Sequence, residues 1–390
     1  MASQFAPSPI CYNLLLNPMK RRALLVLLGL SVALAAWPAE KRKKRKPEEV
    51  TQTLQLPKDP PSAVTAETAR LVFHVSPLSS RGLLSQQVRD ALKWLLQNTR
   101  GAALVRLRAF VAGRGDMRRV QAIVSEVFTD RHLALPALSV IQVGALPQEG
   151  AQVVLESIGV SKKPVNPHGL AFISGQAASA ERPLLPAAPL VEKSVAQLRT
   201  ALGAAGLDSR DVLRATCYLS TLDDFAAVRG RLIAEFPQAA LNFVQRQRAP
   251  VFSLAECEAV ARLRAPPATA LEFLNPPGLA ASPACAQIAL VNAPRVALTG
   301  TQLAFGYSEA DARLAFQRLG KALEQVGASF DQLAMSDIYP VSGSIAGLAG
   351  KVRGEFFNRT RPPASTMLPF EGLPSLDAAF AIDVVGVVRK

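Results

Sequence analysis

One pattern of residues, a strand followed by a tight turn and an amphipathic helix, recurs three times in this chain. Its clearest copy spans residues 212–236. Apolar and polar side chains first alternate with the period of two of a half-buried strand, the apolar ones being Leu213, Ala215, Cys217 and Leu219. Residues 221–224 provide turn and helix-capping chemistry. Apolar residues then recur every three or four positions, as on one face of a helix, at Phe225, Val228, Leu232 and Phe236.

The other two copies lie at residues 330–357 and, in weaker form, at 104–128. The run Val228-Arg229-Gly230 recurs as Val352-Arg353-Gly354 after 124 residues, and Val120 precedes Val228 by 108 residues. A further apolar helical stripe precedes each copy, and a β-rich run follows it. A period just above 100 residues is too long for a solenoid repeat and has the size of a small domain. We therefore predict three tandem domains of one α+β fold.

Proline-rich stretches at 162–167 and 265–277 separate the three units. The predicted domains are repeat 1 (65–163), repeat 2 (164–267) and repeat 3 (268–390). Each should contain two strands, a helix, a strand, a second helix and two closing strands.

The N-terminal region has the layout of an export signal. Residues 1–39 form a predicted leader, and within it residues 19–39 carry three positive charges, an apolar run and an Ala-x-Ala arrangement. The apolar run is short for a bilayer-spanning helix. We expect export to the periplasm or the extracellular space, with an uncleaved N-terminal membrane anchor as the alternative. Because a signal normally begins close to the N-terminus, we expect Met19 rather than Met1 to be the start.

The net charge of +14 is concentrated near the N-terminus. Residues 47–390 hold 35 Lys or Arg and 29 Asp or Glu, a net charge of +6, so specific nucleic-acid binding is not expected. Residues 40–64 form a predicted basic and proline-rich linker. Its basic run from Lys41 to Lys46 is either a solvated tail or a contact for anionic lipid headgroups.

The sequence predicts no metal or cofactor. Its three histidines lack metal-ligand spacing, and the motifs of phosphate loops, nucleophile elbows and dinucleotide-binding turns are missing. Cys11 belongs to the leader. Cys217 and Cys257 fall on predicted strands of repeat 2, where buried free thiols are favoured over a disulfide. Cys285 leaves at least one thiol unpaired.

Two groups of polar residues are candidate ligand contacts. Strands of repeats 2 and 3 end in the hydroxyl–glycine pairs Ser174-Gly175 and Thr299-Gly300, where the backbone can approach a ligand closely. A β-bulge or tight strand end is the alternative. One carboxylate lies within the apolar closing strand of each repeat, at Glu156, Glu258 and Asp383. Such a carboxylate costs free energy unless it is paired, faces a cavity or faces solvent, so the three are functional candidates.

These residues resemble the reactive intermediate deaminase (RidA, or YjgF) family. The resemblance is carried by Gly175-Gln176, by the run TCYLSTLDDFAAVRGRL in repeat 2, by PPAST at 362–366 and by the acid in the closing strand. It spans about residues 65–390. Repeat 1 is degenerate, with His74-Val75-Ser76 where the glycine turn should be.

The resemblance implies a chorismate-mutase-like fold, trimers with a central β core, outer helices and ligand clefts between subunits. In this chain it implies an intramolecular pseudo-trimer, and hence a monomer. It also implies hydrolysis of enamines and imines, with an arginine after Pro-Ala that clamps the substrate carboxylate and an acid that orients water. The acid matches Glu156, Glu258 and Asp383.

The clamp arginine is missing from all three repeats, where Leu138, Leu241 and Ser365 stand in its place. Nearby replacements would be Arg246, Arg248 or Arg361. We therefore favour an exported RidA-like protein that binds a small carboxylate-type ligand in clefts between repeats, with Ser174, Gly175, Thr299, Gly300 and Ser365 as contacts. The alternative is an enamine/imine deaminase with a substitute cation, in which Glu258 or Asp383 orients water. RNA cleavage ranks last.

Overall fold

The computed structural model describes residues 57–113, 115–182 and 185–389. The predicted leader, Cys11 and the run from Lys41 to Lys46 lie outside these residues. The described part is a mixed α+β structure with three sheets and six α-helices. No described helix is both long enough and apolar enough to cross a membrane.

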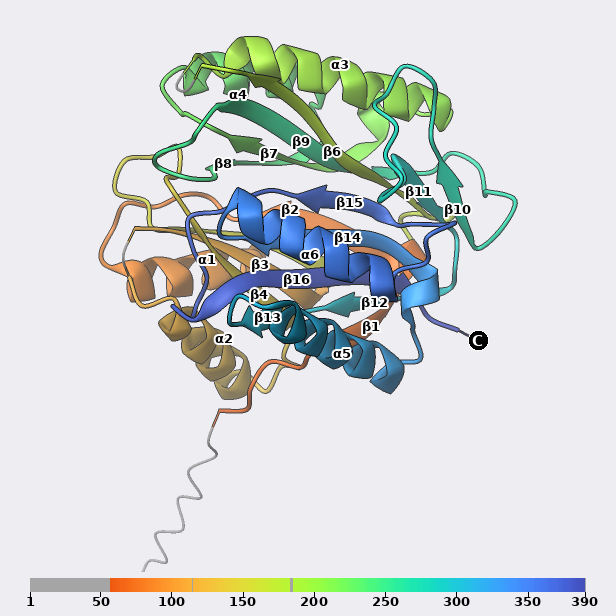
Figure 1. The fold of residues 1–390 in the computed structure, drawn as a ribbon. Coiled ribbons are helices and arrows are strands. Elements are labelled where there is room, and N and C mark those ends of the chain that lie inside the picture. The colour runs from red at the N-terminus through yellow and green to blue at the C-terminus, as the bar shows by residue number, and fades with distance from the viewer. Residues whose placement is uncertain (1–56, 114, 183–184, 390) are drawn as a thin grey trace, which may run out of the picture. The chain divides into compact units, whose positions relative to one another are not determined.

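The order strand, helix, strand, helix, strand, strand occurs three times (Figure 1). Repeat 1 has β1 (Ala63–Glu67), β2 (Leu71–Val75), α1 (Leu84–Asn98), β3 (Ala103–Ala112), α2 (Arg118–Asp130), β4 (Ala137–Val143) and β5 (Val153–Val160). Repeat 2 has β6 (Leu170–Ala180), α3 (Ala188–Ala204), β7 (Val212–Leu219), α4 (Phe225–Glu235), β8 (Ala240–Gln245) and β9 (Ser253–Arg262). Repeat 3 has β10 (Leu271–Leu274), β11 (Ile288–Val291), β12 (Arg295–Thr299), β13 (Gln302–Phe305), α5 (Glu309–Gln325), β14 (Leu333–Pro340), α6 (Gly343–Phe356), β15 (Ala364–Met367) and β16 (Ala378–Val387).

The same pairing of strands is found in each sheet. The closing strand pairs antiparallel with the strand between the two helices, which in turn pairs parallel with a short edge strand. These sets of three are β5-β3-β4, β9-β7-β8 and β16-β14-β15. Residues that face one another across these three strands form one level of the sheet. Each level therefore has a counterpart in the other two sheets.

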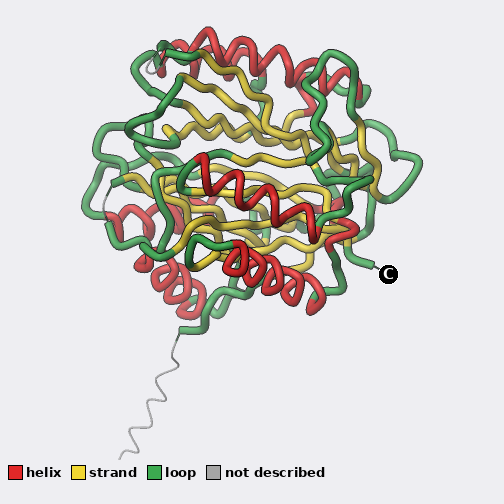
Figure 2. Tube along the Cα trace, in the orientation of Figure 1, coloured by secondary structure: helices red, strands yellow, loops and turns green. Residues whose placement is uncertain are grey.

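The helices form where the apolar stripes predict them. In α1, the buried residues include Leu84, Val88, Leu92 and Leu95, which are spaced along one face. The corresponding stripes of α3 and α5 are buried as well. The helices lie on the outer side of the sheets (Figure 2). Asp224 precedes α4 as expected, but its carboxylate accepts hydrogen bonds from the backbone N–H groups of Ala187 and Ala188 and so caps α3 instead.

Strands cross the predicted domain boundaries. β1 pairs with β12 of repeat 3, and β10 and β11 extend the sheet of repeat 2 through the pairing of β11 with β6. Backbone hydrogen bonds therefore join repeat 1 to repeat 3 and repeat 3 to repeat 2, so these repeats share sheets.

Five apolar clusters make up the core. Three of them each fill the space between one sheet and its own helices. The other two draw residues from all three repeats, one around Phe73, Phe172 and Val385 and the other around Phe110, Tyr218 and Phe370. The inner faces of the sheets are thus buried against one another.

Cys217 and Cys257 form a disulfide, so the expectation of free thiols was wrong. The two residues are direct partners in the antiparallel pair of β7 and β9, with their Cα atoms 4.1 Å apart. Their side chains point into the same apolar core and are fully buried. Cys285 is a free, partly exposed thiol.

Candidate functional site

Each edge strand lies against the opening strands of another repeat. Ser365 and Thr366 of β15 contact Ser174 and Gly175 of β6 through hydrogen bonds of 2.8 and 3.2 Å. The backbone of Leu138 on β4 contacts the segment that follows β12, because its carbonyl accepts a hydrogen bond from the N–H of Thr301. The third edge strand, β8, contacts β2. The three contacts differ in how much space they leave.

The predicted hydroxyl–glycine residues hold strands together in this structure. The hydroxyl of Ser174 donates to the carbonyl of Ala286 and accepts from the N–H of Ser365. The hydroxyl of Thr299 accepts from the N–H of Val384. A Cβ atom on Gly300 would lie 2.6 Å from the carbonyl oxygen of Leu138, so glycine allows this close approach. Gly300 borders a hollow of about 150 Å³ that also touches Leu138.

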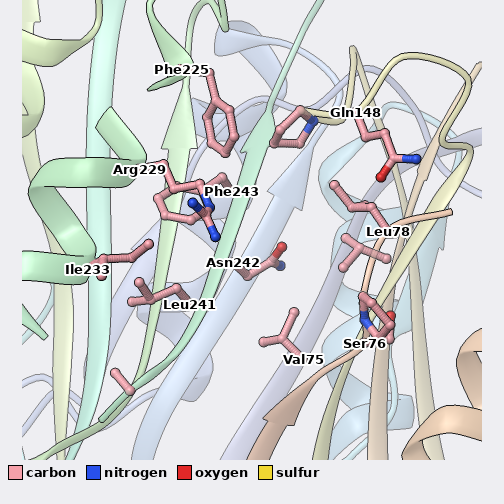
Figure 3. Close-up of a pocket in the computed structure, with 14 residues that line it drawn as sticks. Val75, Ser76, Leu78, Gln148, Phe225, Arg229, Ile233, Leu241, Asn242 and Phe243 are labelled. Atoms are coloured by element: carbon pink, nitrogen blue, oxygen red, sulfur yellow. The ribbon is translucent and has the colours of Figure 1, made fainter. Parts of the chain in front are cut away.

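The contact between repeats 1 and 2 contains a cleft of about 460 Å³ (Figure 3). One wall is formed by residues 75–78 and 147–148, and the other by α4 and β8. Leu241, which stands at a clamp position, lies in the second wall. Arg229 is the only charged residue among the fourteen that line the cleft. Figure 3 shows its guanidinium extending from α4 toward Asn242.

A second hollow of about 520 Å³ continues from this cleft along β2 and β8. His74 and Trp94 line it, and Leu241 belongs to both. Burial, together with the charge of Arg100, lowers the pKa of His74, and its buried Nδ1 has no hydrogen-bond partner among the described residues. At neutral pH, this end of the cleft therefore carries a neutral imidazole.

Glu156, Glu258 and Asp383 come together in one buried ionic cluster between the two shared apolar clusters. Arg108 donates to both Glu156 and Glu258, at 2.8 and 2.7 Å, and Arg106 donates to Asp383. Arg214 also donates to Glu258. The sequence analysis placed one of these acids in the closing strand of each repeat, and in the structure the three stand at corresponding positions of the three sheets.

Each of the three acids also accepts a hydrogen bond from the edge strand of another repeat. Asn242 donates to Glu156, Thr366 donates to Glu258 and Ser139 donates to Asp383, at 2.7, 2.8 and 2.6 Å. These donors immediately follow Leu241, Ser365 and Leu138 in the chain. The ionic cluster therefore ties the three repeats to one another.

The charges of the ionic cluster balance when one carboxyl group is protonated. The cluster has three arginines and four carboxyl groups, the fourth being Asp337, which lies 3.2 Å from Arg108. Burial, followed by the charge of Glu258, raises the pKa of Asp337 well above its usual range. Burial opposes ionisation of Glu156 too, but Arg108 and Arg214 outweigh it and lower its pKa to about 2. A protonated Asp337 leaves three cations facing three anions.

The ionic cluster has little free space. A cavity of about 10 Å³ touches Arg108, Glu156 and Arg214, which is roughly the room that one water molecule needs. No substrate fits there, and the carboxylates already have partners.

The acid that faces the contact between repeats 2 and 3 is Glu256, which the sequence interpretation missed. It lies two residues before Glu258 on the same face of β9, beside Gly175, where a Cβ atom would overlap its carboxyl group. Burial and the neighbouring charge of Glu258 raise the pKa of Glu256 to about 8. Val154 and Ala381 stand at the same level in repeats 1 and 3. Side chains two residues apart on a strand share a face, so the position of Glu258 could have identified Glu256 from the sequence.

The arginines proposed as clamp replacements lie elsewhere. Arg246 is buried and donates to the carbonyl of Pro369, Arg248 pairs with Glu371 at 3.2 Å, and Arg361 donates to the carbonyl of Leu271. None of them lines the cleft of Figure 3. Arg229 on α4 does line this cleft, and its position there depends on the packing of α4 over β8.

Comparisons with known proteins find partial likenesses. A Rid-family protein of unknown function from Yersinia pestis is 16% identical over 31% of this chain and 100% of its own, with a TM-score of 0.28. YjgF-family proteins from Mycobacterium tuberculosis and Neisseria meningitidis are 23% and 15% identical, over 24% and 31% of this chain and 79% and 96% of their own, with TM-scores of 0.23 and 0.24. No family model matches the chain, and no curated protein is similar to it in sequence.

Proposed function

We propose that this protein binds a small carboxylate-bearing ligand with an apolar part in the cleft between repeats 1 and 2. The observation that carries the proposal is the lining of the cleft, where Arg229 supplies one positive charge among mainly apolar side chains. A guanidinium meets a carboxylate with two parallel N–H donors. Leu241, Phe243 and Ile233 offer apolar surface to the rest of the ligand.

Binding has more support than turnover at this site. None of the residues that line the cleft itself is an acid, a histidine, a lysine or a cysteine, and the imidazole of His74 lies in the adjoining hollow, so the cleft alone offers no evident proton-transfer group. The alternative, an enamine/imine deaminase in which Glu258 or Asp383 orients water, has less support because both carboxylates are engaged by arginines in the ionic cluster.

The binding site is tested by replacing its cation. Replacing Arg229 by glutamine should weaken binding of 2-oxoisovalerate by about 10- to 100-fold, since a hydrogen bond to a charged group contributes roughly 1.5–3 kcal/mol. Isothermal titration calorimetry measures the affinity. Lys193→Gln removes an exposed charge outside the cleft and should leave it unchanged. Equal affinity of Arg229→Gln and wild type, or equal binding of the methyl ester, would overturn the proposal.

We further propose that the chain is an exported, RidA-like pseudo-trimer built from one polypeptide. The threefold order of elements and the edge-strand contacts between repeats support the pseudo-trimer. The layout of residues 19–39 supports export, and a disulfide between Cys217 and Cys257 is compatible with an oxidising compartment.

The mature protein should therefore be a monomer that begins near Ala36. Intact-mass spectrometry of the protein recovered from the exported fraction gives the N-terminus, and light scattering gives the assembly. A particle of three chains would contradict the pseudo-trimer, and a full-length cytosolic product would contradict export.

A further inference from the structure

Within the part of the chain that the structure describes, Arg353 is a buried cation without an anionic partner. It lies on α6 with 5% of its surface exposed, and its Nη1 donates to the hydroxyl of Ser365 at 3.1 Å. Among the described residues, no carboxylate lies within 4.0 Å of it, whereas Arg106, Arg108 and Arg214 all have such partners. The hydrogen bond to Ser365 uses one of the five N–H donors of the guanidinium.

An unpaired buried charge is costly to the folded protein. Burial lowers the pKa of Arg353, and the nearby thiol of Cys285 opposes this effect. The Cζ atom of Arg353 lies 5.9 Å from the centre of the Phe357 ring. At this distance the cation–π interaction is weak. A carboxylate that reached Arg353 would meet its planar, multi-donor guanidinium and offset this cost.

The position of Arg353 matches that of Arg229. Both stand in the middle of a Val-Arg-Gly run on the second helix of their repeat. Arg353 reaches the edge strand at Ser365, and Arg229 lines the cleft at Leu241, which are corresponding positions. In repeat 1 the corresponding residue is the neutral Gln121, which borders the hollow at Leu138. Two of the three helices thus present a cation to an edge strand.

Cys285 lies beside the strand that carries Ser365. The N–H of Ala286 donates to the carbonyl of Pro363 at 3.0 Å, and Ala286 forms a parallel bridge with Ala364. The thiol is free and partly exposed, so reagents can reach it from solvent.

We infer that Arg353 and Ser365 form a second anion-binding site, which takes a small carboxylate next to the thiol of Cys285. The inference shares its class of ligand with the proposed function. It rests on a different arginine and on the contact between repeats 2 and 3, so each can fail while the other stands.

Iodoacetate tests this site because it carries both a carboxylate and a group that reacts with thiols. The thiolate of Cys285 attacks its methylene carbon, a thioether bond forms and iodide leaves. Iodoacetamide performs the same displacement without the charge. In a Cys11→Ser background, the ratio of the iodoacetate rate to the iodoacetamide rate at Cys285 measures capture of the carboxylate by Arg353.

We expect Arg353→Met to lower this ratio at least fivefold and acetate to protect Cys285 in the wild type. Arg229→Gln should leave the ratio unchanged, and Arg353→Met should leave binding of 2-oxoisovalerate at the Arg229 cleft unchanged. An equal ratio in Arg353→Met and wild type, or no protection by acetate, would overturn the inference.

A purely structural role of Arg353 makes the opposite prediction for stability. Because its charge is unpaired, Arg353→Met should leave the urea midpoint of the anion-free protein unchanged or raise it. A lower midpoint would assign Arg353 to structure and overturn the site. If Arg353→Met fails to fold, Arg353→Lys, which keeps the charge without the fork, takes its place in the rate comparison. A partly lowered rate ratio then supports the site, and an unchanged ratio overturns it.

Discussion

Replacing Arg108 by methionine will lower the free energy of unfolding by about 3–5 kcal/mol at pH 7, as expected when a buried ion pair loses one partner. Arg108 contacts Glu156, Glu258 and Asp337, which come from all three repeats. Its loss leaves a cluster of carboxylates with too few cations and no solvent to screen them. Urea unfolding followed by circular dichroism measures the effect.

Two further variants separate this mechanism from a simple loss of packing. Arg89 pairs with Glu126 on the surface of the same repeat, so Arg89→Met should cost less than about 1 kcal/mol. Adding Glu258→Gln to Arg108→Met removes one of the stranded charges and should recover part of the lost stability. If the urea midpoint of Arg108→Met equals that of the wild type, the ionic cluster does not hold the repeats together.

Glu256 should make the protein less stable as the pH rises. Its pKa is about 8 in the folded state, chiefly because of burial, and about 4.3 in an unfolded chain. Between these values the folded state binds more protons than the unfolded state, so the free energy of unfolding falls from about pH 4.3 to pH 8 and levels off above. The penalty reaches roughly 3–5 kcal/mol at pH 9.

Glu256→Gln removes this penalty. The variant and the wild type should be equally stable at pH 4, and the variant should be more stable by roughly the full penalty at pH 9. Urea midpoints across the pH range give the difference curve, in which the titrations of all other groups cancel. Glu149→Gln, at an exposed carboxylate, is the control and should show a flat difference. A flat curve for Glu256→Gln would mean that the Glu256 carboxyl titrates normally.

Local structure followed from the sequence. The apolar stripes located α1, α3 and α5, because a helix buries residues that lie three or four positions apart and the sequence displays this spacing directly. The recurrence of strand, turn and helix predicted the order helix, strand, helix, strand, strand of each repeat, but the two expected opening strands occur only in repeat 1, since one strand opens repeat 2 and four precede α5 in repeat 3. The sequence placed Glu156, Glu258 and Asp383 in the closing strands of their repeats, and they stand at corresponding positions of the three sheets.

The surroundings of these residues depended on tertiary structure. The alternation in 212–219 predicted a strand with one wet face, yet Arg214 and Thr216 are buried because a second set of strands covers that face. The residue pattern left open whether the three acids are paired, face a cavity or face solvent, and the structure pairs them with arginines in an ionic cluster. The cation of the cleft proved to be Arg229, since α4 packs across β8.

Local structure can be read from the sequence and the surroundings of a residue cannot, because the two depend on neighbours at different distances along the chain. Helix and strand periodicity depends on neighbours a few residues away, and the sequence alone determined it. The partners of a charge or a thiol come from anywhere in the chain. Arg108 meets Glu258 across 150 residues, and Cys217 meets Cys257 across 40. Only the packing of the three sheets decided which of these groups would face one another, and with what room between them.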